Sequence, residues 1–555
     1  MSEIDLPAPA LRSVTGDQVS GVAPSAAERA REFPLRETIA VAVFAALLIM
    51  PPLGRHLIAY SGEARMALLA QDMIERHVLF RARVEGQVYR NKPPLYPWSI
   101  ALVSLPVGRV TEGTAQVPVA VAAVAAALCT CLLGARLFGR RSGLWAGLIL
   151  VTSAGFFSHS QALLPDMLVT AFTTAAGYAF WRSVSGPRER LALAGFYLAL
   201  AFAVFSKGPV GLLPLLAAAV WLWSGRGLPG LAHLLSPSGL VIFAAITLAW
   251  LAPFLAAGGK SFGSSVVWGD WLSWYLGLPS PQRVGRFLLD GLMGFLPWTI
   301  ALPLGLAHAV RARSDPAARW ALLSFLVPLT IIVLSRNRQP IYLLPIYPAA
   351  AVITAWWADA RGAAAGAPAR ALGWLALLGA IAAVIATPFI PEVRDSVLRV
   401  PNILWKALPV GVGVVLLGSL LFWGLRRGRP AIAVYGGALV MAAVLSAGVR
   451  INDEAIGLTQ DFRVVATALA RHAGGADIRL FSASLLLPVD FYVGRQLERM
   501  DRVEDLRQYL ARPDRPVVLI DRTYWLAFQR DFPSDLRLLE RIPIQGQELF
   551  IVRRS

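Results

Sequence analysis

The sequence predicts an α-helical polytopic membrane protein, with about thirteen transmembrane helices, that carries a small α/β domain at its C-terminal end. First, 56% of the 555 residues are apolar and 15% are charged, whereas soluble domains carry about 25% charged residues. Second, apolar stretches long enough to cross a bilayer recur along the chain. Third, the pattern changes after residue 450 to short segments that alternate polar and apolar residues.

The expected spans are the apolar runs that approach the length of about 20 residues needed to cross a bilayer. A shorter run, 95–106, ends in Pro106 and has only about 12 residues, so a juxtamembrane or re-entrant helix is expected there. The expected spans cover residues 38–54, 115–136, 142–158, 163–181, 191–206, 208–224, 238–257, 288–310, 318–334, 341–357, 369–389, 404–425 and 430–449.

The distribution of arginine predicts which side of the membrane each loop faces. Arg29, Arg31 and Arg36 precede the first run, and loops rich in Lys and Arg stay in the cytoplasm, so the N-terminus is expected to be cytoplasmic. If 95–106 does not cross, the remaining arginine-rich loops also face the cytoplasm. The odd number of spans then places the C-terminal end outside, in the periplasm of a bacterium. These loops account for the net charge of +18, so no nucleic-acid partner is expected.

Three regions follow from this topology. Residues 1–35 are rich in Ala, Ser, Pro and charge and are expected to form a disordered cytoplasmic tail. Residues 36–450 form the transmembrane domain, with a long outer loop at 55–114. Residues 451–555 form the outer α/β domain, with strands expected at 479–483, 516–520 and 548–552 and a helix at 503–510.

Two acidic residues and a helix stand out on the expected outer side. Residues 63–77 place apolar side chains at near-helical spacing with charges opposite, which predicts a helix lying on the membrane surface. Glu63 opens this helix, and Asp166 lies at the mouth of a span. A solvated loop acid is one interpretation of Asp166, but an ionisable residue embedded in apolar sequence favours a functional one.

Several cations are expected on the same side. Arg65 and Lys92 lie in the outer loop, and Arg336 and Arg338 precede a span. Positive charge outside runs against the cytoplasmic bias and calls for an anionic partner, for which phosphate is suited because arginine forks match its oxygens. Lys207, between two closely spaced spans, is a further candidate, although a lysine at a helix end often only extends to the headgroups.

The outer loop 258–287 adds two further candidates, Arg283 and Arg286, among tryptophans and a tyrosine. The aromatic residues alone are typical of a membrane-interface belt. Acids can serve as a general base and cations can hold a phosphate leaving group, so the outer face predicts group transfer from a lipid phosphate. Glu63 and Asp166 could share a divalent cation, although no histidine cluster supports a metal site.

Taken together, these segments resemble the GT-C glycosyltransferases that use a polyprenyl-phosphate-linked sugar, a group similar to the aminoarabinose–lipid A transferases and the protein O-mannosyltransferases. The resemblance covers most of the chain and rests on the order of the motifs and their common side. After the acid and arginine of Glu63–Arg65, the motifs are Asn91–Tyr96, Pro165–Met167, Ser206–Pro209, Phe295–Trp298, Tyr342–Pro348 and Asp490–Tyr492.

The resemblance implies an inner-membrane enzyme that moves a sugar from undecaprenyl phosphate to lipid A, an envelope glycan or a protein, with inversion at the anomeric carbon. It implies that Arg65, Lys92 and Tyr342 hold the donor phosphate and that Asp166 is an essential acid. The family usually has Asp-Glu where this chain has Gly62-Glu63. Either Glu63 or Asp166 is therefore the base, or the chemistry has changed. The resemblance does not identify the sugar, the acceptor or the oligomeric state.

Two other functions remain open at this point. A lipid-linked sugar transporter or flippase would show inverted repeats and interrupted helices at mid-membrane, whereas the charged positions here gather at one surface and no repeat joins the halves. A non-catalytic scaffold on the same fold would follow if the glycine at position 62 had abolished the chemistry.

Overall fold

The structure is a computed structural model, and it describes residues 33–89, 91–186, 188–257, 281–335, 338–360, 367–390, 397–484, 486–544 and 546–555. The expected N-terminal tail up to residue 32, Arg336 and most of the loop 258–287 lie outside the described residues, as does the side chain of Arg283.

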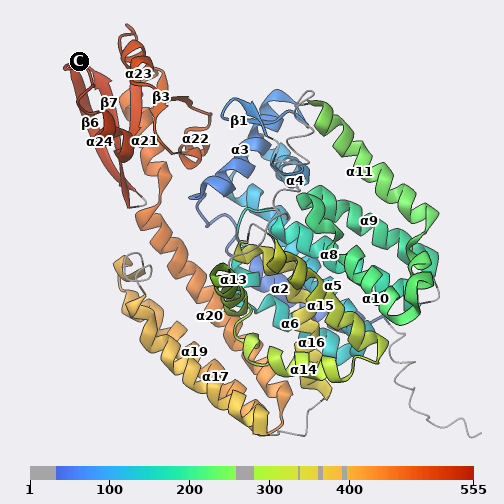
Figure 1. Cartoon of the computed structure of the whole chain (residues 1–555). Helices are drawn as coiled ribbons and strands as arrows, with labels where there is room; N and C mark the ends of the chain where they lie inside the picture. The colour runs from blue at the N-terminus through green and yellow to red at the C-terminus, as the bar shows by residue number, and fades with distance from the viewer. Residues whose placement is uncertain are drawn as a thin grey trace, which may run out of the picture.

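The transmembrane region is a bundle of helices, and each of the thirteen apolar runs contains helix (Figure 1). The fold class is therefore confirmed. The helices are α2 (Leu35–Ile49), α5 (Glu112–Phe138), α6 (Arg140–Val151), α7 (Ala154–His159), α8 (Asp166–Ser185), α9 (Glu189–Lys207), α10 (Leu213–Gly230), α11 (Pro237–Ala257), α13 (Pro281–Gly294), α14 (Leu302–Arg311), α15 (Pro316–Leu334), α16 (Tyr347–Ala360), α17 (Ala367–Ala386), α19 (Ile403–Arg426) and α20 (Pro430–Thr459).

The helices differ in length and hydropathy, and therefore in whether they can cross a membrane. Within the described part of the chain, eight helical segments are long and apolar enough to span a bilayer, so the chain is a multi-pass membrane protein and the number thirteen stays a prediction. One of the eight, Glu189–Leu234, joins two runs that were expected to be separate spans. The helix α20 has 30 residues, about 45 Å at 1.5 Å per residue, and leads from the bundle toward the C-terminal domain (Figure 1).

The outer loop after α2 is folded against the bundle. It contains α3 (Ser61–Arg76), the hairpin of β1 (Arg83–Val84) and β2 (Gln87–Val88), α4 (Leu95–Ser104) and the 3₁₀ turn η1 (Leu105–Val107). The predicted helix 63–77 and the short helix 95–106 are thus confirmed as helices. The expectation that the charges of α3 face away from the apolar side is wrong, because Glu63 and Asp72 are buried with the apolar residues. The backbone N–H of Arg83 donates to the carboxylate of Asp72 at 2.9 Å.

The C-terminal domain is a five-stranded mixed sheet in the order β4-β3-β5-β7-β6. The strands β4, β3 and β5 are parallel, and β7 and β6 continue the sheet in antiparallel pairing. Three strands and one helix match the expected segments, whereas β4 and β6 were not predicted. The elements are α21 (Phe462–Ala473), β3 (Ile478–Phe481), α22 (Leu487–Val493), β4 (Glu498–Met500), α23 (Val503–Leu510), β5 (Val517–Asp521), α24 (Arg522–Phe528), β6 (Leu536–Ile544) and β7 (Gln547–Arg554).

Several hydrogen bonds tie the C-terminal domain to the outer loop. The backbone N–H of Ile58 donates to the hydroxyl of Tyr492 at 3.0 Å. Gln496 accepts from the backbone N–H of Glu85 and donates to the carbonyl of Arg83, both at 2.8 Å. The domain therefore rests on the same loop that carries the predicted site residues.

Candidate active site

A cavity of about 450 Å³ brings together five of the ten residues that the sequence singled out. We call it the cationic cavity. The charged residues among the described lining are Arg65, Lys92, Lys207 and Asp166, so three cations face one acid. Its lining also includes Gly62, Met66, Tyr89, Asn91, Leu164, Val169, Pro209, Val210, Ile332, Ser335, Gln339, Ile341, Tyr342 and Pro345.

The single acid of this cavity is paired with a lysine. Asp166 is the first residue of α8 and is 3% exposed, at a helix N-terminus, where negative charge is favoured. The ammonium of Lys207 forms an ion pair with its carboxylate and lies 4.0 Å from the centre of the Tyr342 ring. A cation over an aromatic face gains about 0.5–2 kcal/mol, so Lys207 is held from two sides. The carboxylate and the ring thereby fix the position of the ammonium between them.

The backbone after α9 explains why Lys207 lies there. Gly208 has a φ of +71°, which L side chains rarely adopt. A Cβ at Gly211 would lie 2.3 Å from the backbone N of Val204, so the chain can fold back tightly only with glycine at this position. This turn ends α9 at Lys207, at the level of the outer loop.

Lys92 and Arg65 supply the remaining charge of the cationic cavity. Within the described residues, neither has a carboxylate at ion-pair distance. Burial of Lys92, together with the positive charges of Lys207 and Arg65, lowers its pKa to about 8, although Asp166 partly opposes this. A half-buried cation among other cations carries an electrostatic cost, and a bound anion would relieve that cost.

Two other predicted cations lie elsewhere. The Nε of Arg338 donates to the carbonyl of Val333 at 2.9 Å, and Arg286 forms an exposed ion pair with Asp290 one helical turn away. Neither is among the described residues that line the cationic cavity. Arg336 and the side chain of Arg283 lie outside the described residues.

Glu63 lies in a neighbouring cavity of about 810 Å³, which we call the acidic cavity. Its described charged and titratable lining residues are Glu63, Asp453, His56 and His159. The rest of the lining is Tyr60, Gly62, Ala154, Phe157, Ser158, Gln161, Ala162, Leu164, Gln339, Pro340, Ile341, Val410, Val444, Leu445, Gly448, Val449, Asn452 and Ile456.

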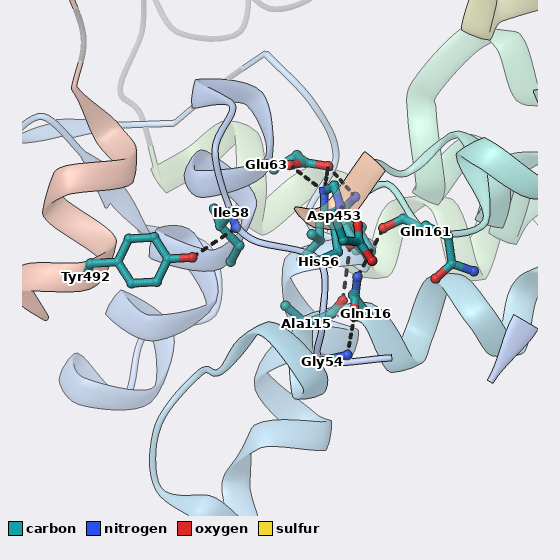
Figure 2. Close-up of polar contacts among 11 residues, drawn as sticks. Gly54, His56, Ile58, Glu63, Ala115, Gln116, Gln161, Asp453 and Tyr492 are labelled. Atoms are coloured by element: carbon teal, nitrogen blue, oxygen red, sulfur yellow. Dashed lines mark hydrogen bonds and ion pairs between the residues drawn. The ribbon is translucent and has the colours of Figure 1, made fainter. Parts of the chain in front are cut away.

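A histidine bridges the two acids of this cavity, and Figure 2 shows the three side chains pointing toward one another. The Nε2 of His56 lies 3.2 Å from both carboxylate oxygens of Glu63, and its Nδ1 lies 3.7 Å from Asp453. Burial disfavours the charged imidazole, but Asp453 and Glu63 outweigh it and raise the pKa of His56 to about 10. His56 is thus an imidazolium at neutral pH.

Backbone and amide groups hold this network in place. Glu63, which is 4% exposed, also accepts from the backbone N–H of Leu163 at 3.2 Å. Gln116 accepts from the backbone N–H of Gly54 at 2.5 Å and donates to the carbonyl of Gln161 at 3.3 Å, below the acids in Figure 2. The loop that carries His56 is therefore tied to α5 and to the segment before α8.

The two cavities adjoin one another. They share the lining residues Gly62, Leu164, Gln339 and Ile341. These residues therefore lie between the cavity that holds Asp166 and the cavity that holds Glu63. A Cβ at Gly62 would meet only Leu164, at an ordinary 3.8 Å. The glycine is therefore not required by packing.

Sequence reasoning missed His56 and Asp453. Asp453 lies on α20, where the polar residues Asn452–Glu454 interrupt an apolar helix, and that interruption was the available signal. A metal shared by Glu63 and Asp166 would need both carboxylates in one place, but each faces its own cation in its own cavity. Within the described residues, no group of three or more His, Cys, Asp or Glu is arranged to hold a metal ion.

Known proteins share the fold and part of the sequence. Residues 91–256 match the family described as dolichyl-phosphate-mannose-protein mannosyltransferase. The undecaprenyl phosphate-alpha-4-amino-4-deoxy-L-arabinose arabinosyl transferase of Shewanella sediminis is 26% identical over 57% of this chain and 59% of its own length. The corresponding transferase of Pseudomonas aeruginosa strain LESB58 is 27% identical over 56% of this chain and 57% of its own. The chain therefore spans less than two thirds of the curated relatives that it matches.

Solved structures cover more of the chain. ArnT from Cupriavidus metallidurans, solved with bound undecaprenyl phosphate, superposes with a TM-score of 0.78 at 18% identity, over 93% of this chain and 97% of that one. The archaeal oligosaccharyltransferase AglB from Archaeoglobus fulgidus superposes with a TM-score of 0.52 at 10% identity, over 88% and 69%. The resemblance to the GT-C transferases is thus confirmed in the fold, and in sequence over residues 91–256.

Proposed function

We propose that the chain is an inverting glycosyltransferase that moves a sugar from an undecaprenyl-phosphate donor to an acceptor, which is lipid A, an envelope glycan or a protein, at the periplasmic face of the bacterial inner membrane. The observation that carries the proposal is the pair of adjoining cavities, one with excess cations and the other with paired acids. Such a pair supplies the two things that the reaction needs: a site for an anionic leaving group and a site for the proton of the nucleophile.

The cationic cavity is the proposed donor site. Arg65 and Lys92 have no carboxylate of their own among the described residues, so they would bind the phosphodiester and then stabilise the second negative charge that appears when the sugar leaves. That charge exists only after bond cleavage begins, and interactions that strengthen at that stage accelerate the reaction. Tyr342 would act by holding Lys207 in place. The relatives named for undecaprenyl phosphate and the undecaprenyl phosphate in the superposed structure support this assignment.

Glu63 is the proposed base. Its carboxylate lines the acidic cavity, next to the glycine that both cavities share. Asp166 is a weaker candidate because it lies within the proposed donor site, where it is paired with Lys207 and would face the phosphate of the donor. In the proposed step the acceptor oxygen bonds to the anomeric carbon from the face opposite the phosphate. The bond from that carbon to the phosphate oxygen breaks, its electron pair stays with the polyprenyl phosphate, and Glu63 takes the proton of the acceptor.

The surrounding organisation is proposed as follows. Residues 1–35 form a cytoplasmic tail, 36–450 the catalytic transmembrane domain with its periplasmic loop 55–114, and 451–555 the periplasmic domain. The positive charge of the short loops supports this orientation. The contact of Tyr492 with Ile58 supports a role for the periplasmic domain in holding the loop that carries His56.

The test is sugar transfer by the purified chain in proteoliposomes with an undecaprenyl-phosphate-linked sugar. Lys92→Ala is expected to lower turnover at least about tenfold, since a charge-assisted hydrogen bond contributes about 1.5–3 kcal/mol, and Lys92→Arg is expected to retain most of it. Arg471→Ala removes an exposed cation from α21 in the C-terminal domain and serves as the matched control. Full activity of Lys92→Ala would remove the cationic cavity from the mechanism.

A further inference from the structure

The acidic cavity has one apolar wall and one polar end. Val410 of α19 and Val444, Leu445 and Val449 of α20 line the apolar wall. The polar end holds the network of Glu63, His56 and Asp453, together with Asn452 and His159. A cavity of this kind fits an amphiphile whose chains lie along α19 and α20 and whose head reaches Glu63.

The residues at the polar end do not allow it a net positive charge. The described charged groups of the lining are two carboxylates and two imidazoles. With both carboxylates ionised, two protonated imidazoles would only balance them. The net charge of the polar end is therefore zero or negative. In the cationic cavity three cations face one acid. The cationic cavity therefore favours an anionic ligand, whereas the acidic cavity does not.

Among the described lining residues of the acidic cavity, two histidines are the side chains able to carry a positive charge, and both are already engaged. His56 lies between Glu63 and Asp453, and the Nδ1 of His159 donates to the carbonyl of Gly155 at 2.6 Å. The two carboxylates share the one imidazolium of His56, which leaves one net negative charge. A phosphate brought to about 4 Å from that charge would cost about 4 kcal/mol at the effective dielectric constant of a protein surface. No lysine or arginine among the described lining residues would offset that cost.

We propose that the acceptor is an amphiphile that presents a neutral hydroxyl, with no phosphate at the reacting position, and that Glu63 and Asp453 select it by excluding anionic head groups. This proposal rests on the proposed function and specifies its acceptor class. The hydroxyl oxygen forms the bond to the anomeric carbon, its proton goes to Glu63, and polyprenyl phosphate leaves from the cationic cavity. A phosphate oxygen as nucleophile would instead bring negative charge to the acids.

The experiment compares two lipid probes that differ only in the head group. Dioleoylglycerol and dioleoylphosphatidic acid, each with a photoreactive diazirine in one tail, are added to the full chain in phosphatidylcholine nanodiscs. Undecaprenyl phosphate is present in excess to fill the cationic cavity. After irradiation, mass spectrometry of peptides measures the labelling of residues 444–456 and of Val410.

The hydroxyl probe is expected to label these positions at least about tenfold more than the phosphate probe. Asp453→Asn is expected to narrow that ratio, because it removes one of the two acids while keeping the size of the side chain. Equal or stronger labelling by the phosphate probe would overturn the proposal. This result is separable from a failure of the proposed function, which would instead show as no release of polyprenyl phosphate from the donor with any acceptor.

Discussion

The imidazole of His56 and the carboxylate of Glu63 form a buried pair, with Nε2 3.2 Å from each carboxylate oxygen. Glu63 lies in the first turn of α3. Asp453 of α20, which is distant in the sequence, contacts the other ring nitrogen of His56. Glu63 is thereby separated from the lysine-paired Asp166. The two acids that the sequence places on one face thus have different partners and different cavities, which supports different roles for them.

The His56 network predicts a loss of stability at high pH. The folded-state pKa of about 10 lies above the ordinary value of 6.5, so the contribution is fully present below about pH 6.5 and is lost as the pH rises through about 10. Thermal unfolding in detergent is expected to show the wild type losing stability between pH 7 and pH 10. His56→Gln should be less stable at pH 7 by about 2 kcal/mol and should lack this dependence. A parallel decline in both proteins would contradict the assignment.

The ion pair of Asp166 and Lys207 predicts that substitutions of these two residues have non-additive effects on the free energy of unfolding. Lys207→Met leaves a buried carboxylate unpaired, which costs about 3–5 kcal/mol, and Asp166→Asn similarly leaves the ammonium without its anion. The double variant is expected to be more stable than the sum of the single effects allows, by at least about 1 kcal/mol. Unfolding of the four proteins under one condition measures this coupling, and additive losses would show that the pair does not hold the site.

Lys92 predicts how donor binding depends on pH. Its pKa of about 8 means that the cation is lost near pH 8, well below the ordinary value of 10.5. Affinity for undecaprenyl phosphate is expected to be highest below pH 8 and to fall as the pH rises toward 10. Lys92→Arg should bind with little change over that range, because arginine stays charged. Titration of the nanodisc-bound protein measures both curves, and a decline preserved in Lys92→Arg would assign it to another group.

Replacing the carboxylate of Asp490, in the C-terminal domain, by a neutral amide is predicted to stabilise the protein at high pH. Asp490 is buried on α22, and burial raises its pKa to about 7, although the backbone N–H of Leu497 partly opposes this. The folded state holds a proton that the unfolded state releases near pH 3.8, so stability falls as the pH rises from about 4 through about 7. Asp490→Asn is expected to be more stable than the wild type at pH 8 and equal to it near pH 4. A variant less stable at both values would show that the carboxylate is needed in its charged form.

Local sequence patterns predicted the helices because hydrophobic length and periodicity are local properties. Each of the thirteen apolar runs contains helix, and α3, α4 and α23 lie where they were expected. Strand β4 was missed because its three residues carry no apolar alternation. The thirteen-span count depends on how helices such as α9 and α10 join, which composition does not determine.

The residues of the cationic cavity were predictable from the sequence, but the pairing of Glu63 was not. Lys92, Asp166 and Lys207 were selected from their chemistry and their expected side of the membrane, and Tyr342 from the family resemblance. The four residues do meet in one cavity. The pairing of Glu63 was not predictable, because Asp453 reaches it from the far end of the chain. Such contacts depend on how α20 packs against the rest of the bundle, and no local period encodes that packing.

The most direct test of the central claim follows the donor phosphorus by ³¹P NMR in proteoliposomes that contain the chain, an undecaprenyl-phosphate-linked sugar and a hydroxyl-bearing acceptor lipid. Transfer converts a phosphodiester into a phosphate monoester. The predicted result is a monoester signal that grows with the glycosylated acceptor and is strongly reduced for Lys92→Ala and for Glu63→Gln. A donor that changes leaflet but stays a phosphodiester, or a monoester signal unchanged in both variants, would contradict it.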